Sequence, residues 1–183
     1  ESFNINICND FRNIKINILP YEIQNIKSYK DDFILGKTDL KSENYDILLS
    51  LQHDMRTAII PSFIVKIGNG AFTKYFTKNV IFPNDSKLSF IGNNAFNNSK
   101  IDEIKIPKYV KIISQNAFAC CDNLQKIKFD DDSKLEIICQ NAFYSSNLYE
   151  IRIPRQVKII KEYAFSNCNN LKRVLFDDNS ILE

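Results

Sequence analysis

A repeat of 47 residues runs through most of this chain. The tripeptide Ser-Lys-Leu at residues 86–88 recurs at 133–135, and a related Ser-Ile-Leu follows at 180–182. A shorter period lies within it, because Ala-Phe occurs five times in steps of 24, 22, 25 and 22 residues. A fixed period of roughly 20 to 50 residues marks a solenoid, in which each unit buries its apolar face against its neighbours. The sequence therefore predicts a stack of coils that presents an extended surface.

Residues 101–118 show how one unit is built. Ile101, Ile104 and Ile106 follow the spacing L-x-x-L-x-L, which is typical of a short strand with one buried face. Pro107 then ends the ladder, because proline has no amide proton to donate. The same frame, which Thr77 breaks once, recurs at Met55/Ala58/Ile60, Val80/Phe82, Leu124/Ile127/Phe129, Leu148/Ile151/Ile153 and Leu171/Val174/Phe176.

Each unit ends on Ala-Phe. We expect the phenylalanines to fill the interior as one column, formed by Phe72, Phe96, Phe118, Phe143 and Phe165. Asparagine precedes three of these dipeptides, as a capping or turn residue would, at Asn94, Asn116 and Asn141. The predicted fold is a β-rich α/β solenoid with a parallel sheet on the concave side and short turns or helical turns on the convex side.

These motifs resemble a known family. Alternating Ile-Pro and Phe-x-x-x-Ser-x-Leu units that close on Ala-Phe closely resemble BspA-like leucine-rich repeats, over residues 55–183. Tyr-Asp-Ile-Leu ahead of Ile-Ile-Pro-Ser-Phe-Ile, between residues 45 and 64, resembles the branch expanded in parasitic protozoa such as trichomonads. The resemblance implies a leucine-rich-repeat solenoid and a surface-antigen or cell-adhesion role. It specifies no ligand.

The two ends depart from the regular pattern. Residues 1–54 contain degenerate units, with alternating isoleucines at 14–18 and a candidate strand at 45–49, and we predict that they cap the array. A separate small domain is the alternative. Residues 55–183 form the regular array, which we expect to be truncated at the C-terminus, because the unit beginning at Ser180 lacks its Ala-Phe. An uncapped C-terminal coil would allow end-to-end self-association.

Composition narrows the possible partners. The net charge of +2, from 24 basic and 22 acidic residues in 183, argues against a nucleic-acid binder. No apolar run approaches the roughly 18 to 20 residues that span a bilayer, so we expect no membrane insertion within this chain.

The residues that could carry chemistry favour structural roles. The only histidine, His53, lies in a polar stretch, and the Asp-rich segments at 130–132 and 177–178 are explained by turn formation rather than by calcium. Cys121 and Cys168 lie two coils apart, roughly 10 Å, which is too far for a disulfide, so we expect free structural thiols. We therefore predict no enzyme, no metal and no cofactor. An activated thiolate at Cys120 or Cys139 is the catalytic alternative.

The outward positions of the predicted strands form two columns. The first is Thr57, Asn79, Glu103, Lys126, Glu150 and Arg173, and the second is Ile59, Ile81, Lys105, Lys128, Arg152 and Leu175. Lys105, Lys128 and Arg152 would repel one another at strand spacing. Either nearby carboxylates, including Asp130, neutralise them, or they contact an anionic or acidic partner. The predicted partner-binding face comprises Ile59, Ile81, Lys105, Lys126, Lys128, Arg152, Arg173 and Leu175.

The functional expectation is a non-enzymatic protein-binding module. Its ligand would be a protein of unknown identity, met at the cell surface if the family resemblance extends to function. An intracellular, cytoplasmic scaffold for protein–protein interaction is the alternative, which the expected free thiols favour.

Overall fold

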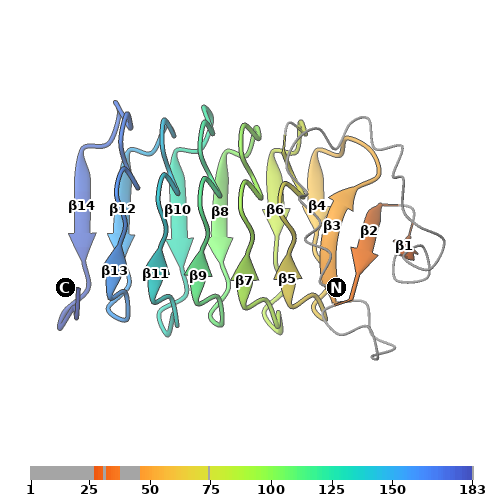
Figure 1. Cartoon of the computed structure of the whole chain (residues 1–183), viewed down its shortest axis with the longest axis horizontal. Coiled ribbons are helices and arrows are strands. Elements are labelled where there is room, and N and C mark those ends of the chain that lie inside the picture. Colours follow the sequence, from red (N-terminus) through yellow and green to blue (C-terminus); the bar gives the residue numbers. More distant parts are fainter. Residues whose placement is uncertain (1–26, 31, 38–45, 74, 183) are drawn as a thin grey trace, which may run out of the picture.

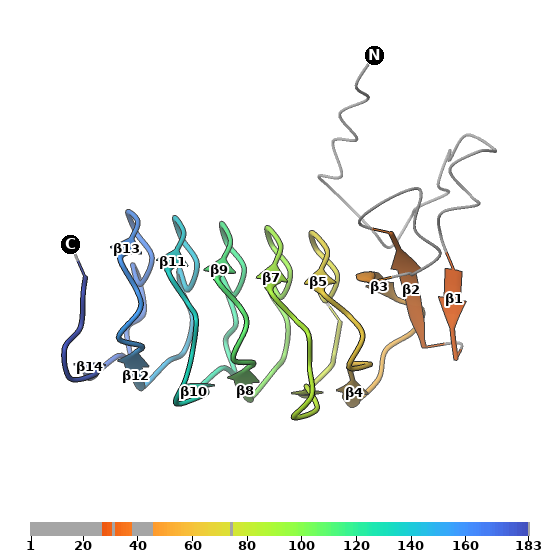
Figure 2. The same ribbon diagram turned by 90° about the horizontal axis from the view of Figure 1, so that it is seen from below.

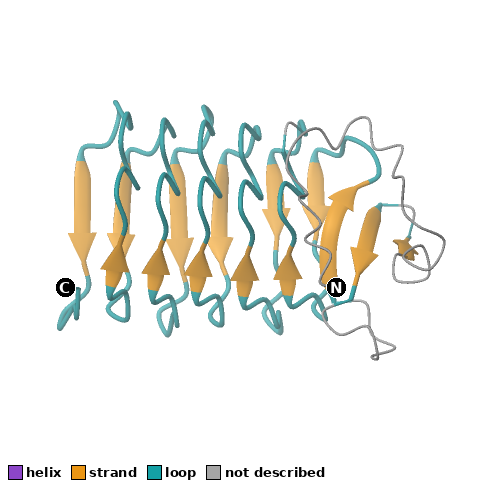
Figure 3. Cartoon of the chain, viewed as in Figure 1, coloured by secondary structure: helices purple, strands orange, loops and turns teal. Residues whose placement is uncertain are grey.

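The computed structural model describes residues 27–30, 32–37, 46–73 and 75–182. Over these ranges the chain is a β-solenoid whose coils stack side by side along the long axis of the molecule (Figure 1). The described residues contain strands, turns and loops and no helix (Figure 3). The predicted solenoid with a parallel sheet is confirmed, and the option of helical turns is not adopted.

One side of the solenoid is a six-stranded parallel sheet, here called the long-strand sheet. Strands such as Glu103–Ile106 and Lys126–Phe129 alternate exposed and buried residues, because every second side chain faces the core. The strands coincide with the predicted L-x-x-L-x-L frames: β4 (Thr57–Ile59), β6 (Asn79–Ile81), β8 (Glu103–Ile106), β10 (Lys126–Phe129), β12 (Glu150–Ile153) and β14 (Arg173–Phe176).

The opposite side is a second sheet, here called the return sheet (Figure 2). The sequence predicted only turns there. Five two-residue strands pair in parallel: β5 (Lys66–Ile67), β7 (Phe90–Ile91), β9 (Ile112–Ile113), β11 (Ile137–Ile138) and β13 (Ile159–Ile160). The order then continues through an antiparallel group at its end: β3 (Ile47–Leu51), β2 (Phe33–Gly36) and β1 (Lys27–Tyr29).

The Ala-Phe segments form tight turns. The residue before alanine adopts the left-handed region, with φ of 55° at Asn94, Asn116 and Asn141 and 66° at Gly70. The turn closes on itself, as Ala117 N donates to Ser114 O at 3.2 Å, and Phe118 N donates to Ala142 O of the next coil at 2.7 Å. A left-handed residue cannot continue a right-handed helix, which is why the helical option is not realised.

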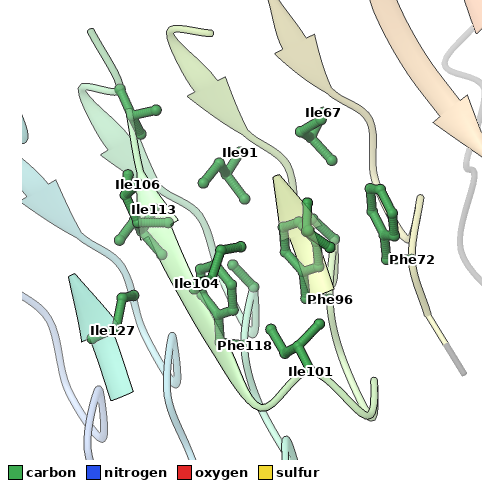
Figure 4. Close-up of a cluster of buried hydrophobic side chains, with 14 of the residues drawn as sticks. Ile67, Phe72, Ile91, Phe96, Ile101, Ile104, Ile106, Ile113, Phe118 and Ile127 are labelled. Atoms are coloured by element: carbon green, nitrogen blue, oxygen red, sulfur yellow. The ribbon is translucent and has the colours of Figure 1, made fainter. Parts of the chain in front are cut away.

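A stack of phenylalanine rings runs through the core. Neighbouring rings from Phe72 to Phe165 lie 4.7, 4.9, 5.4 and 5.2 Å apart between centroids and are nearly parallel, with interplanar angles of 17°, 4°, 7° and 3°. Figure 4 shows Phe72, Phe96 and Phe118 in a row among the isoleucines of the strands. The predicted column is confirmed.

The predicted N-terminal cap is only partly described. The isoleucine-rich segment at 14–26 and Tyr45 lie outside the described residues, and Ile47 and Leu49 fall within β3. The antiparallel strands β1 and β2 continue the return sheet beyond β3, at the end opposite β13. The division into a capping segment, residues 1–54, and a regular array, residues 55–183, stays a prediction.

Candidate binding face and interstrand cleft

The long-strand sheet presents the predicted face to solvent. Ile59 and Ile81 are partners in the ladder between β4 and β6 and are 64% and 47% exposed. Next to them, Asn79 Nδ2 donates to Thr57 Oγ1 at 3.3 Å, so this end of the face carries no charge in its two outward columns. Lys126, Lys128, Arg152 and the other cations of the face lie on β8, β10, β12 and β14. The face is therefore apolar at one end and charged along the rest.

Each cation of the second column has a carboxylate partner one coil away. Lys128 Nζ lies 3.2 Å from Glu103 Oε2, and Arg152 Nη1 donates to Asp177 Oδ1 at 2.8 Å. Lys105 pairs with Asp130, whose hydrogen bond and charge raise the pKa of the Lys105 ammonium. These pairs neutralise the row of cations within the chain itself. Contact with an anionic partner stays a hypothesis.

The sheet opens between β10 and β12. β8 and β10 pair at four residues, as do β12 and β14, whereas β10 and β12 pair only at Lys126 and Glu150. Beyond that pair lies a cleft of about 480 Å³. Its lining residues are Lys126, Ile127, Lys128, Phe129, Asp130, Asp131, Glu150, Arg152, Pro154 and Asp177.

The alternating corners of the solenoid explain why the sheet opens there. The corner from Ile106 to Val110 is two residues shorter than the corner from Phe129 to Leu135. A backbone hydrogen bond joins the longer corner to the shorter corner of the preceding coil: Lys134 N donates to Lys108 O at 2.8 Å. Lys87 and Ile181 make the equivalent bonds, to Ser62 and Arg155. These hydrogen bonds join the coil of β8 to that of β10, and the coil of β12 to that of β14. The cleft lies at the boundary between these two pairs of coils.

Comparison with known proteins assigns this solenoid to a family. The profile of the BspA type leucine rich repeat region matches residues 50–179 in six copies. The chain belongs to the BspA-type leucine-rich-repeat family. The leucine-rich-repeat protein of T. pallidum superimposes with a TM-score of 0.68 at 25% identity, covering 81% of this chain and 70% of its own.

Two further solved structures share the fold and belong to longer proteins. The pneumococcal vaccine antigen PcpA has a TM-score of 0.71 at 21% identity, and a leucine-rich-repeat protein of Bacteroides ovatus has 0.67 at 25%. The matches cover 85% and 81% of this chain but only 50% and 40% of those proteins. No curated protein sequence matches the chain. These neighbours are bacterial, and the likeness to a protozoan branch stays a prediction.

The thiols of this BspA-type array have structural surroundings. Cys121 and Cys168 are free, as predicted, and their thiols donate to the carbonyls of Phe96 at 3.1 Å and Phe143 at 3.0 Å. Burial raises the pKa of Cys121 to about 12 and also raises the pKa of Cys139. A raised pKa keeps a thiol protonated and unreactive.

The other residues considered for chemistry are dispersed. His53 Nε2 lies 3.3 Å from Asp32 Oδ1 on the exposed surface. Asp130 and Asp177 serve the ion pairs of the face. Within the ranges that the structure describes, no three acidic, histidine or cysteine side chains gather to hold a metal.

The return sheet carries an apolar stripe that was not predicted from the sequence. The first residues of four successive strands lie in register and remain partly or largely exposed, and Ile159 is 44% exposed. The sequence signal for this stripe is a pair of adjacent apolar residues in each unit. Only the second residue of each pair is needed to fill the core, so the first is left for the surface. The return-sheet stripe consists of Phe90, Ile112, Ile137 and Ile159.

Proposed function

We propose that the chain is a non-enzymatic protein-binding module of a surface antigen or adhesin-like protein that contacts host or matrix proteins. The observation that carries this proposal is the exposed face of the long-strand sheet, which runs across six strands from two isoleucines to a row of ion pairs. A face of this length suits a protein partner, because many strands contribute contacts at once. The apolar end would supply burial, and the charged strands would supply specificity.

The surroundings of the polar residues support a role without catalysis. Cys121 and Cys139 have raised pKa values, and His53 pairs with an exposed aspartate rather than with a nucleophile. A nucleophilic mechanism needs a nucleophile and a base within hydrogen-bond reach of each other.

The proposed surface location rests on the family resemblance. PcpA, which shares the fold, is a vaccine antigen of pneumococcus. Among the described residues, none forms an apolar helix that could reach across a bilayer.

The face can be tested by charge reversal. The chain would be screened against matrix and host-cell proteins, and binding to any partner found would be compared with that of Lys128→Glu/Arg152→Glu at low salt. We expect at least a tenfold loss of affinity, because the reversed residues repel both an acidic partner and their own carboxylate neighbours. Lys161→Glu, an exposed lysine just after β13 on the return side, is the matched control. Equal binding by all three proteins would move the contact off this face.

The location can be tested on cells. Antibody against residues 55–183 would be applied to intact and to permeabilised cells of the source organism. Labelling of intact cells is the expected result. Labelling only after permeabilisation would favour the second candidate, an intracellular scaffold. That candidate draws support from the free thiols of Cys120, Cys121, Cys139 and Cys168, which suit a reducing compartment.

A further inference from the structure

The cleft between β10 and β12 holds an unpaired cation at its closed end. Lys126 faces Glu103 on one neighbouring strand and Glu150 on the other. Both carboxylates are already engaged, Glu103 by Lys128 and Glu150 by Arg173. No carboxylate of the described chain lies within 4.0 Å of the exposed Lys126 ammonium.

The opposite end of the cleft holds an unpaired anion. Asp131 lies in the corner that follows β10, between two aspartates that are both engaged. Asp130 pairs with Lys105, and Asp132 pairs with Lys108 at 3.2 Å. Over the described ranges, no cation lies at ion-pair distance from the exposed Asp131 carboxylate, whose charge acts only at longer range, as one contribution to the raised pKa of Lys105.

The cleft therefore has a positive end at Lys126 and a negative end at Asp131. Lys126 and Asp131 are five residues apart, a separation of up to about 16 Å in extended chain at about 3.3 Å per residue. The apolar part of the lining consists of the partly buried Phe129 and the buried residues Ile127 and Pro154. The remaining charges of the lining, among them Lys128 and Arg152, already have partners.

The geometry points to an extended peptide of a protein partner, about five residues long, with an acidic side chain at one end and a basic side chain at the other. The acidic group pairs with Lys126, the basic group pairs with Asp131, and small apolar residues between them lie against the partly buried Phe129. β10 and β12 have no further ladder pair beyond Lys126 and Glu150, and the cleft there leaves room for the peptide backbone. This inference rests on the proposed protein-binding function and specifies the partner's chemistry.

The composition of the cleft argues against a simple ion. Three cations and four carboxylates line it, so an inorganic anion meets more negative than positive groups. A metal ion needs several converging carboxylates, and the described residues offer no such group. A ligand that carries one negative and one positive group, spaced like Lys126 and Asp131, can pair with both residues at once.

Peptide selection followed by charge exchange tests the inference. Heptapeptides displayed on phage would be selected on the purified chain, and the best sequence would be synthesised. We expect an acidic and a basic residue separated by about three to five positions. Lys126→Glu should weaken binding of that peptide at least tenfold at low salt. Exchanging the acidic residue of the peptide for lysine should restore binding to Lys126→Glu and weaken binding to the unchanged chain.

A variant at the other end of the cleft and two control variants complete the test. Asp131→Lys should weaken the same peptide similarly, whereas Asp178→Lys, at the equivalent position of the next long corner, and Lys161→Glu should not. All variants would first be checked for unchanged thermal unfolding. Failure to enrich any peptide, or equal binding by Lys126→Glu, overturns the inference. If the chain still binds a whole protein partner through Lys128 and Arg152, the proposed function survives that failure.

Discussion

Tyr163 holds a backbone conformation that tyrosine rarely adopts. Its φ is 58°, and the equivalent positions of the other coils are Gly70 and the asparagines Asn94, Asn116 and Asn141. Glycine and asparagine tolerate the left-handed region, whereas a bulky side chain is strained there. The ring of Tyr163 is 65% exposed, so little buried contact offsets this strain.

Replacing Tyr163 by asparagine should therefore stabilise the chain. We expect Tyr163→Asn to raise the free energy of unfolding by about 1 kcal/mol, measured by urea titration. Tyr163→Ala is the control, because it removes the ring but keeps a residue that disfavours positive φ. An equal gain in both variants would show that the ring, not the backbone, is the source of the effect.

Thr77 is a polar residue in an apolar column. It replaces the leucine or isoleucine found at Ile101, Leu124 and Leu148, its side chain is fully buried, and its hydroxyl finds no hydrogen-bond partner among the described residues. Thr77→Val keeps the shape and removes the unsatisfied group, so the free energy of unfolding should rise by about 1 to 3 kcal/mol. Thr77→Ser keeps the hydroxyl and should lower it. A loss of stability in Thr77→Val would indicate that the hydroxyl is satisfied.

Cys121 makes stability depend on alkaline pH. Burial raises the pKa of its thiol to about 12, above the ordinary value of 9.0, so the folded state keeps a proton that the unfolded state releases. The stabilisation is complete below pH 9 and is lost as pH rises towards 12. Compared with Cys121→Ser, which copies Ser99 and Ser146, the unchanged chain should lose up to about 1 kcal/mol per pH unit above pH 9. Parallel urea titrations at pH 8 and pH 10.5, in reducing agent, measure the difference. Identical pH dependence of the two proteins would contradict this assignment.

At the scale of the elements, sequence patterns differ in what they predict. The long-strand sheet was predictable because its strands span three or four residues within an alternating frame that ends at proline or aspartate. The return sheet was not, because strands such as β9 and β11 contain two residues, too few to show alternation. The Ala-Phe turns were predictable in part. The asparagine before three of the dipeptides indicated a turn or capping position, but the sequence did not indicate that its φ is positive.

Part of the candidate site was likewise predictable from the sequence, and part of it was not. Alternation placed Ile59, Ile81 and the basic residues on one exposed face, and the carboxylate partners of Lys105 and Lys128 were foreseen as an alternative. The cleft was not predictable, because it depends on how the corners tie β8 to β10 and β12 to β14. Such pairing between coils is a consequence of the stacked structure, and no single unit of the sequence contains it.

At the scale of the whole molecule, stability is shared between neighbours in the stack. Each coil packs only against the next one, so the free energy of unfolding is a sum of coil and interface contributions. Phe118 lies at the centre of the ring column, is fully buried, and contacts rings on both sides at 4.9 and 5.4 Å. Phe165 occupies the last ring position and is only partly buried.

This difference in position predicts different outcomes for the same substitution. Phe118→Ala should lower the free energy of unfolding by about 3 to 5 kcal/mol, since it removes a large buried side chain and leaves a cavity. Because the lost contacts join two parts of the array, its urea transition should also broaden or split in circular dichroism. Phe165→Ala should cost less and leave a single transition, because only one ring contact is lost. Equal losses with single sharp transitions in both variants would show that the array unfolds as one unit, with no coil able to uncouple from the rest.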